Sequence, residues 1–134
     1  MQYRMFSSLT LWLRISVAII LFTHSIPGMF DGGINAFGNL YLNEIGFAPF
    51  GLALAWAIKL SHVVCAVLLL LNKQILLACL TTIAILIMGI IMVHFREGWF
   101  VVGGGRNGVE YNFLLIAVLV QIMVNERRTP PATR

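Results

Sequence analysis

Charged residues are scarce in this chain of 134 amino acids. Lysine, arginine, aspartate and glutamate together make up 10% of the sequence, whereas apolar residues make up 60%. A soluble globule needs more polar material than this to cover its surface, so the composition predicts an integral membrane protein. Because each helical crossing takes about 20 residues, the chain has room for a single domain of about four spans and for no soluble catalytic domain.

Several common functional motifs are also missing. Cys65 and Cys79 form no Cys-x-x-Cys motif, so we expect them to pack as small apolar side chains rather than to act as a dithiol. The glycines at 103–105 match neither a Walker loop nor a dinucleotide fingerprint; a turned connection and an anion-binding nest assisted by Arg106 both remain open. The net charge of +4 comes without a basic stripe, so no nucleic acid is expected as a partner.

The long apolar runs predict four helical spans, over residues 9–29, 48–71, 75–93 and 109–124 of one domain that covers residues 1–134. The first run is followed by no small-x-small cleavage pattern, so we interpret it as a retained span. Only Asn72-Lys73-Gln74 separates the second run from the third, which must therefore return antiparallel. The fourth run is only about 24 Å long, against a hydrocarbon core of about 30 Å, so it is expected to begin in a protein-lined recess or below the interface.

The segment between the first two spans has a different pattern. Asparagines and a glutamate separate apolar residues that recur at helical spacing, namely Ile34, Phe37, Leu40, Tyr41 and Ile45. This pattern predicts a short amphipathic helix on the membrane surface, which either seals the bundle or docks a partner. The expected fold is therefore all-α: an integral membrane four-helix bundle with a short amphipathic outer helix.

The positions of the basic residues predict the orientation in the membrane. Arg96 and Arg106 fall on one side, and the remaining ones near helix ends fall on the other: Arg4, Arg14, Lys73, Arg127, Arg128 and Arg134. Because basic residues tend to remain on the cytoplasmic side, both termini are predicted to be cytoplasmic. The lipid bilayer is the first expected partner.

Every histidine of the chain lies within or beside an apolar run. His24, His62 and His94 are accompanied there by Lys59 and Glu110. Ionisable residues in membrane spans usually face the bundle interior and mark a ligand, ion or proton site. At about 1.5 Å per residue, His24 lies ~9 Å from the outer end of its span, Lys59 ~15 Å and His62 ~20 Å, whereas His94 and Glu110 lie within the first ~3 Å.

These residue types suit a quinone or another small acceptor. An imidazole can donate a hydrogen bond to a quinone oxygen and exchange a proton near neutral pH, and a nearby lysine or carboxylate can tune it. His24, His94 and Glu110 are the candidate catalytic residues, and the candidate substrate-binding set is His24, Lys59, His62, His94, Arg96 and Glu110. Glu110 is the expected counterion of Lys59, and His62 is expected to act as a relay or as a packing residue. Each histidine alone would equally suit an interhelical hydrogen bond.

No haem or metal is expected. Two axial histidines must approach a haem iron at similar height, whereas His24 and His94 differ in depth by about 6 Å or more. Zinc or iron bound by His24, His94 and Glu110 would suit the ligand chemistry, but no short-range ligand motif supports it.

The order of several motifs resembles the DoxX-like family of membrane proteins. The resemblance covers about residues 10–124 and rests on Arg14, Thr23-His24-Ser25-Ile26-Pro27-Gly28, Phe37, Ile45-Gly46-Phe47-Ala48-Pro49, His94-Phe95-Arg96-Glu97-Gly98 and Gly104-Gly105-Arg106-Asn107-Gly108-Val109-Glu110-Tyr111-Asn112. Two positions depart from the family pattern. His62 stands where the family often has a glutamate, and residues 125–134 lack its Gly-x-Gly-x-x-Ser tail.

The resemblance implies a four-helix protein of the bacterial cytoplasmic (inner) membrane, with His24, His94 and Glu110 as family-like polar positions. Relatives include a subunit associated with thiosulfate:quinone oxidoreduction. The expected function is a membrane component of a redox process, such as a subunit of a quinone-linked oxidoreductase, that binds a quinone or other small molecule in an outward-opening polar pocket. The expected protein partner is a redox-partner protein or a second copy of the chain. The alternatives are a noncatalytic membrane-protein assembly factor or chaperone and, without evident inverted repeats to support it, a small transporter.

Overall fold

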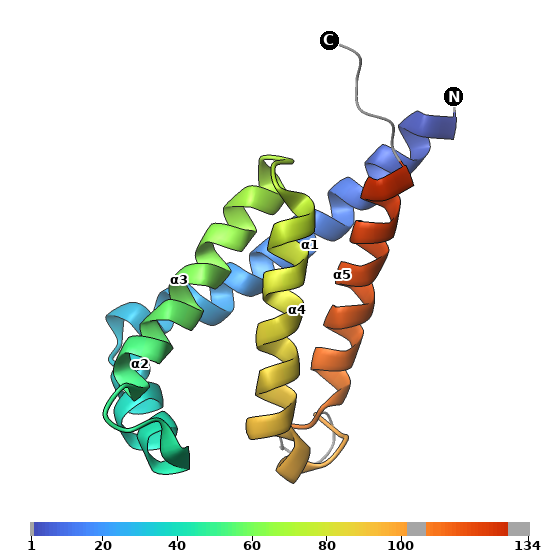
Figure 1. Cartoon of the computed structure of the whole chain (residues 1–134). Coiled ribbons are helices and arrows are strands. Elements are labelled where there is room, and N and C mark those ends of the chain that lie inside the picture. Colours follow the sequence, from blue (N-terminus) through green and yellow to red (C-terminus); the bar gives the residue numbers. More distant parts are fainter. Residues whose placement is uncertain (1, 102–106, 129–134) are drawn as a thin grey trace.

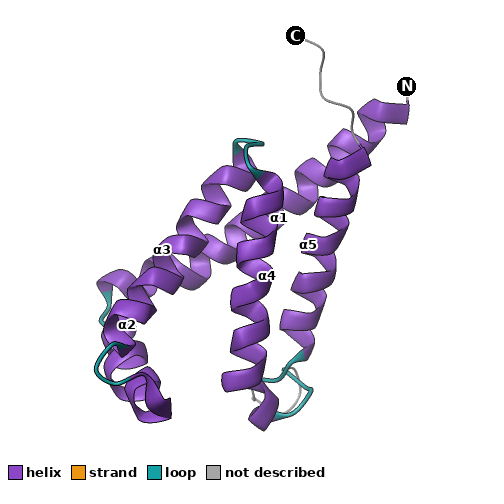
Figure 2. Ribbon diagram, viewed as in Figure 1, coloured by secondary structure: helices purple, strands orange, loops and turns teal. Residues whose placement is uncertain are grey.

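The computed structural model describes residues 2–101 and 107–128. Within these ranges the chain forms helices and no strand (Figure 2). The elements, in chain order, are α1 (Gln2–Phe30), α2 (Gly33–Asn35), the π-helix η1 (Ala36–Phe47), α3 (Gly51–Leu70), α4 (Ile75–Met92), the 3-10 helix η2 (His94–Glu97) and α5 (Glu110–Arg128).

Three of the helices are long and apolar enough to cross a membrane. They are Thr10–Phe30 of α1, Gly51–Leu70 (α3) and Ile75–Met92 (α4). These spans indicate an integral membrane protein. Helix α5 is not one of the three; Glu110 begins it, and it ends with Glu126, Arg127 and Arg128.

The four long helices contact one another in cyclic order: α1 packs on α3, α3 on α4, α4 on α5, and α5 on α1. The start of α1, the end of α5 and the turn between α3 and α4 lie at one end of the molecule, which we call the terminal end (Figure 1). Helices η1 and η2 lie at the opposite end, here called the loop end. Helices α3 and α4 are antiparallel, as the short turn between them predicted.

Helix boundaries differ from the predicted ones at the first and last helices. Helix α1 begins at Gln2 rather than at residue 9, and it contains Pro27, although proline removes a backbone donor. Helix α5 extends to Arg128, one turn beyond the predicted end at residue 124. That last turn is polar, so a search for apolar runs could not include it.

A buried apolar core fills the half of the molecule nearer the terminal end. All four long helices contribute to it, with residues at helical spacing: Val17, Ala18 and Leu21; Cys65, Ala66 and Leu69; Ile75, Ala78 and Cys79; and Leu115, Leu119 and Ile122. Both cysteines belong to this core as free, buried thiols. Burial of apolar side chains between helices is the packing that the sequence pattern predicts.

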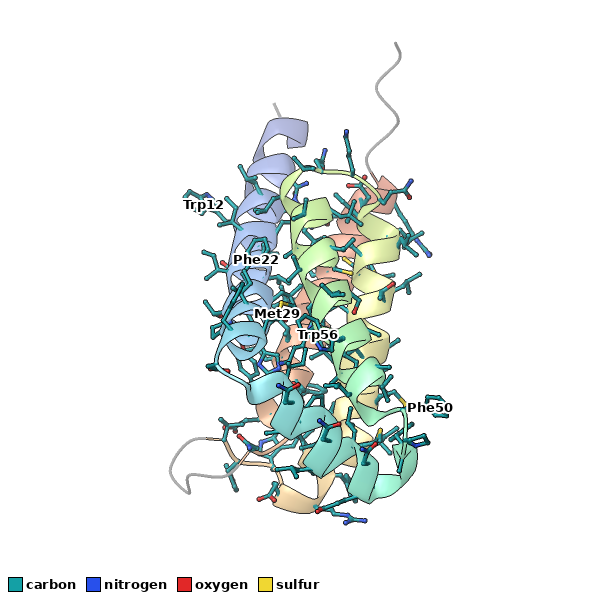
Figure 3. The ribbon with its side chains drawn as sticks, turned by 90° about the vertical axis from the view of Figure 1, so that its left-hand side faces the viewer. Trp12, Phe22, Met29, Phe50 and Trp56 are labelled. Atoms are coloured by element: carbon teal, nitrogen blue, oxygen red, sulfur yellow. The ribbon has the colours of Figure 1, made fainter. Side chains whose placement is uncertain are left out.

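Large apolar side chains also cover the outside of the helices. Trp12 and Phe50 are 68% and 71% exposed and project away from the ribbon (Figure 3). An outer surface of this kind is compatible with contact with lipid.

The expected outer helix is present, and it buries part of the predicted apolar set. Ile34 is buried and Phe37 and Tyr41 are partly buried against the same cluster, whereas Leu40 is 64% exposed. Leu42, which the pattern did not select, is also buried. Residues 36–47 form a π-helix, whose turns are wider than those of the α-helix used for the prediction.

Close backbone contact fixes this outer helix to the start of α3. A Cβ added to Gly38 would lie 2.6 Å from the Cα of Leu52, so only glycine fits there. The Asn43 Oδ1 accepts a hydrogen bond from the Gly51 N–H at 2.9 Å and satisfies one free donor of the helix start. A second contact joins the outer helix to the end of α4, where the Tyr41 hydroxyl donates to the carbonyl oxygen of Met92 at 3.0 Å.

Arg14 links α1 to the turn between α3 and α4 at the terminal end. Its side chain is buried, and its guanidinium donates to the Oδ1 of Asn72 in the α3–α4 turn and to the carbonyl oxygen of Thr10. Asn72 and Gln74 both have positive φ angles, which permit the tight return of the chain. The basic residue that was expected to anchor the span at the interface thus also links α1 to this turn.

Candidate functional site

His62 is the most deeply buried ionisable side chain of the predicted site. It lies on the inner face of α3 with 4% of its surface exposed. Its Nδ1 is 3.4 Å from the hydroxyl oxygen of Ser25, which is fully buried on α1. Its Nε2 is buried and has no hydrogen-bond partner among the described residues. Since nearly all buried polar atoms are paired, this nitrogen marks a position where a ligand can bind.

His24 lies beside His62. The two ring centroids are 6.1 Å apart, and the rings are tilted by 55°. His24 is exposed, so the pair combines one accessible imidazole with one buried imidazole. The two histidines therefore lie together between α1 and α3, although residue counting placed His62 about 11 Å deeper than His24.

Lys59 approaches the same place from one turn earlier in α3, on the side of the loop end. Its ammonium donates to the carbonyl oxygen of His24 at 2.9 Å and lies 5.9 Å from the ring centroid of Phe37. A carbonyl and an aromatic face both stabilise a cation, although neither neutralises it. The hydrogen bond of Lys59 thus goes to the backbone of His24, and its pairing with Glu110 stays a prediction.

His94 lies on the other pair of helices, at the end of α4. Its Nδ1 donates to the carbonyl oxygen of Asn107 at 2.6 Å, so its Nε2 is the free ring nitrogen of the neutral form. The charged forms of His94 and Lys59 lie close enough to His24 to act on it electrostatically. These three residues and His62 therefore form one basic cluster, which we call the histidine–lysine cluster.

Glu110 has a different local role. Its Oε1 accepts a hydrogen bond from the Val101 N–H at 2.8 Å. Backbone hydrogen bonds from Val109 to Gly98 and from Glu110 to Trp99 join the same two stretches of chain, and Gly108 packs directly against the carbonyl oxygens of Trp99 and Phe100. Glu110 and His94 thus both hold the connection between η2 and α5. Arg96 is exposed in η2, and within the described part of the chain it does not contact the histidine–lysine cluster.

The structure also reveals buried polar residues that the sequence analysis did not select. Going from the apolar core toward the loop end, the next inward-facing residue is polar in each long helix. Leu21 is followed by Ser25, Cys65 is preceded by His62, Cys79 is followed by Thr82, and Leu115 is preceded by Asn112. We call Ser25, His62, Thr82 and Asn112 the polar layer; all four are at least nine-tenths buried.

The members of the polar layer differ in the hydrogen bonds that their side chains make. The Thr82 hydroxyl donates to the Ala78 carbonyl oxygen at 2.8 Å within its own helix. Ser25 and His62 contact each other. Asn112 makes no side-chain hydrogen bond to any residue that the structure describes, although it is only 6% exposed. The signal that could have identified Asn112 is its spacing, since it continues the inward-facing series 115, 119 and 122 by one step.

Metal binding finds no support in the geometry. In residues 2–101 and 107–128, no three side chains among histidine, cysteine, aspartate and glutamate are placed to hold a metal ion. The predicted anion-binding nest at glycines 103–105 and Arg106 lies outside the described residues. The chemistry available in the described part is therefore hydrogen bonding, proton exchange and the positive charge of Lys59.

Comparisons with protein-family models, with curated proteins and with solved structures find no match for this chain.

Proposed function

We propose that this protein is a membrane component of a redox process that binds a quinone, or a similar small molecule with a carbonyl oxygen, at His62. One observation carries the proposal: the Nε2 of a fully enclosed imidazole has no partner among the described residues, next to a second imidazole and an ammonium group. When the Ser25 hydroxyl donates to Nδ1, the ring proton of neutral His62 is on Nε2. This N–H would donate to the carbonyl oxygen of the ligand.

The neighbouring groups suit the same ligand. The positive charge of Lys59 stabilises negative charge on a carbonyl oxygen of the ligand, and this effect is strongest when the quinone is reduced and deprotonated. His24 can take up and release a proton near neutral pH, and its ring centroid lies 6.1 Å from that of His62. Reduction of a quinone to a quinol takes two electrons and two protons. A redox-partner protein would supply the electrons, and the two histidines would pass the protons.

The proposal also includes the four-span architecture and the DoxX-like family. Support comes from the cyclic contacts of the four long helices and from the inward-facing series of α5, which matches those of the three apolar helices. Charges at the two ends of α5 are compatible with a span whose ends lie near the interfaces. Both termini would then face the cytoplasm of a bacterial cell.

The test is a titration of the purified protein in lipid nanodiscs with decylubiquinone, comparing the native chain with His62→Leu and Cys65→Ala. Cys65 is buried on the same face of α3, one turn closer to the terminal end, so its substitution controls for disturbance of the core. We expect His62→Leu to weaken binding at least tenfold, because a bound carbonyl would lose its buried donor, and Cys65→Ala to leave it unchanged. Equal affinities of the native and His62→Leu proteins would contradict the proposal.

The alternative, a noncatalytic assembly factor, gives a different result in the same material. Such a factor would not bind the quinone, and the abundance of one membrane protein that purifies with it would fall when this chain is deleted. His62→Leu would leave that abundance unchanged.

A further inference from the structure

We infer that Phe37 of the outer helix is a positioning residue of the quinone site, because its aromatic face holds the ammonium group of Lys59 near the two neighbouring histidines. This inference rests on the proposed function and extends the site from α1 and α3 to η1. Phe37 does not need to touch the ligand. It acts through the position that the end of the Lys59 side chain takes.

The first argument is the geometry around the ammonium group. The Nζ of Lys59 lies 5.9 Å from the ring centroid of Phe37 and donates to the carbonyl oxygen of His24 at 2.9 Å. A cation within about 6 Å of an aromatic centroid is attracted by the negative face of the ring. Groups from two different elements, α1 and η1, therefore favour a single position for the end of one flexible side chain.

The second argument is the direction from which Phe37 approaches. A lysine in a membrane span tends to extend its long stem toward the nearer interface, where its ammonium reaches water. Lys59 lies in the half of α3 nearer the loop end, and η1 lies at that end (Figure 1). Phe37 thus offers the ammonium a favourable contact within the protein, on the side toward which the side chain would otherwise leave the site.

The third argument is that Phe37 is itself held in place. Its ring stacks on that of Tyr41, with centroids 6.0 Å apart and planes inclined by 11°. The Tyr41 hydroxyl is fixed in turn by its hydrogen bond to the Met92 carbonyl oxygen at the end of α4. Both rings also pack against the buried apolar cluster between the outer helix and α3. A side chain locked by its neighbours can position another one, which a mobile side chain cannot.

The first experiment measures decylubiquinone affinity in nanodiscs for Phe37→Leu and Phe37→Tyr. Leucine keeps an apolar side chain and removes the aromatic face, whereas tyrosine keeps the aromatic face. We expect Phe37→Leu to weaken binding roughly threefold to tenfold and Phe37→Tyr to bind with native affinity. An equal loss of affinity in both variants would contradict the inference.

Phe47→Leu is the matched control for this substitution. Phe47 belongs to the same helix η1 and packs, partly buried, against the same apolar cluster, but its ring contacts no cation among the described residues. The affinity of Phe47→Leu should therefore stay native. A loss as large as that of Phe37→Leu would show that the packing of η1, and not the aromatic face of Phe37, matters for binding.

A double-mutant cycle with Lys59→Met tests whether Phe37 acts through Lys59. Phe37→Leu should weaken binding in the native chain and have no further effect when residue 59 is already methionine. An equal loss in both backgrounds would overturn the inference, because Phe37 would then act independently of Lys59.

NMR of lysine labelled with ¹³C at Cε gives a readout that needs no ligand. Lys59 and Lys73 are the only lysines of the sequence, so Lys73→Met assigns the two signals. We expect the ring current of Phe37 to shift the Lys59 Hε resonances, and we expect this shift to be lost in Phe37→Leu and kept in Phe37→Tyr. A Lys59 signal that is the same in the native and Phe37→Leu proteins would refute the positioning role.

The failure of this inference differs from the failure of the proposed function. If His62→Leu weakens decylubiquinone binding and Phe37→Leu does not, the role of Phe37 fails alone. If neither substitution has an effect, the proposed function fails as well.

Discussion

The hydroxyl oxygen of Ser25 on α1 lies 3.4 Å from the Nδ1 of His62 on α3, and both side chains are buried. This contact sets which ring nitrogen of His62 remains available for a ligand. It also links the two helices at the boundary between the apolar core and the loop end. The consequences of this arrangement can be tested residue by residue.

Ser25→Ala should weaken decylubiquinone binding by less than His62→Leu does, roughly threefold to tenfold, because it removes one hydrogen bond that favours the Nε2–H tautomer. The measurement is the same nanodisc titration. Ser61→Ala is the control, since the Ser61 hydroxyl donates only to the Ile58 carbonyl oxygen of its own helix. A Ser25→Ala protein with native affinity would show that Ser25 does not set the tautomer.

Lys59→Met should weaken decylubiquinone binding about tenfold without lowering the unfolding temperature of the ligand-free protein. The physical reason is that an ammonium group in a membrane span costs about 2.5–3.5 kcal/mol on insertion scales. The hydrogen bond of Lys59 to the neutral carbonyl oxygen of His24 offsets only part of this cost. Lys73→Met removes the same charge from the exposed turn at the terminal end. Its affinity for the quinone should stay native. A marked loss of stability in Lys59→Met would instead assign Lys59 a structural role.

Glu110→Gln should leave the connection between η2 and α5 intact, whereas Glu110→Leu should loosen it. Glutamine keeps an oxygen that can accept from the Val101 N–H, and leucine does not. Hydrogen–deuterium exchange at Val101 reports the difference directly. With one hydrogen bond lost, worth about 0.5–1.5 kcal/mol, exchange in Glu110→Leu should accelerate by roughly twofold to tenfold. Equal exchange in both variants would exclude this role.

Gly38→Ala should destabilise the protein by roughly 1–3 kcal/mol, because the added methyl group would meet the backbone of Leu52 and push η1 away from α3. Gly28→Ala is the control, since its nearest neighbour atom would lie at an ordinary 3.8 Å. Thermal unfolding of the two variants compares them. A Gly38→Ala protein as stable as Gly28→Ala would mean that the close contact of η1 with α3 contributes nothing.

The sequence predicted the large elements well because apolar runs have a clear length and the α3–α4 turn is unmistakable. It selected His24, Lys59 and His62 as candidate site residues, but their depths from residue number, ~9, ~15 and ~20 Å, did not predict the contact between the two histidine rings. The outer helix was predicted in its place, but the apolar pattern missed the buried Leu42 and could not distinguish a π-helix from an α-helix in a segment as short as η1.

Side-chain partners were the least predictable feature. No pattern in the sequence indicated that Lys59 would contact the carbonyl oxygen of His24 or that Glu110 would contact the backbone of Val101. Asn112 was overlooked because it is neither charged nor a histidine. Its membership of the polar layer follows only from its place beside a core whose other residues come from distant parts of the chain.

The most direct test of the central claim is ¹⁵N NMR of the protein with labelled histidines, recorded in nanodiscs with and without decylubiquinone. The account predicts a neutral His62 ring with its proton on Nε2, and a shift of the Nε2 resonance to the position of a hydrogen-bonded donor when the quinone binds. His62→Leu identifies the signal by its loss. A His62 ring protonated on Nδ1 alone, or an Nε2 resonance unchanged at saturating quinone, would contradict the account.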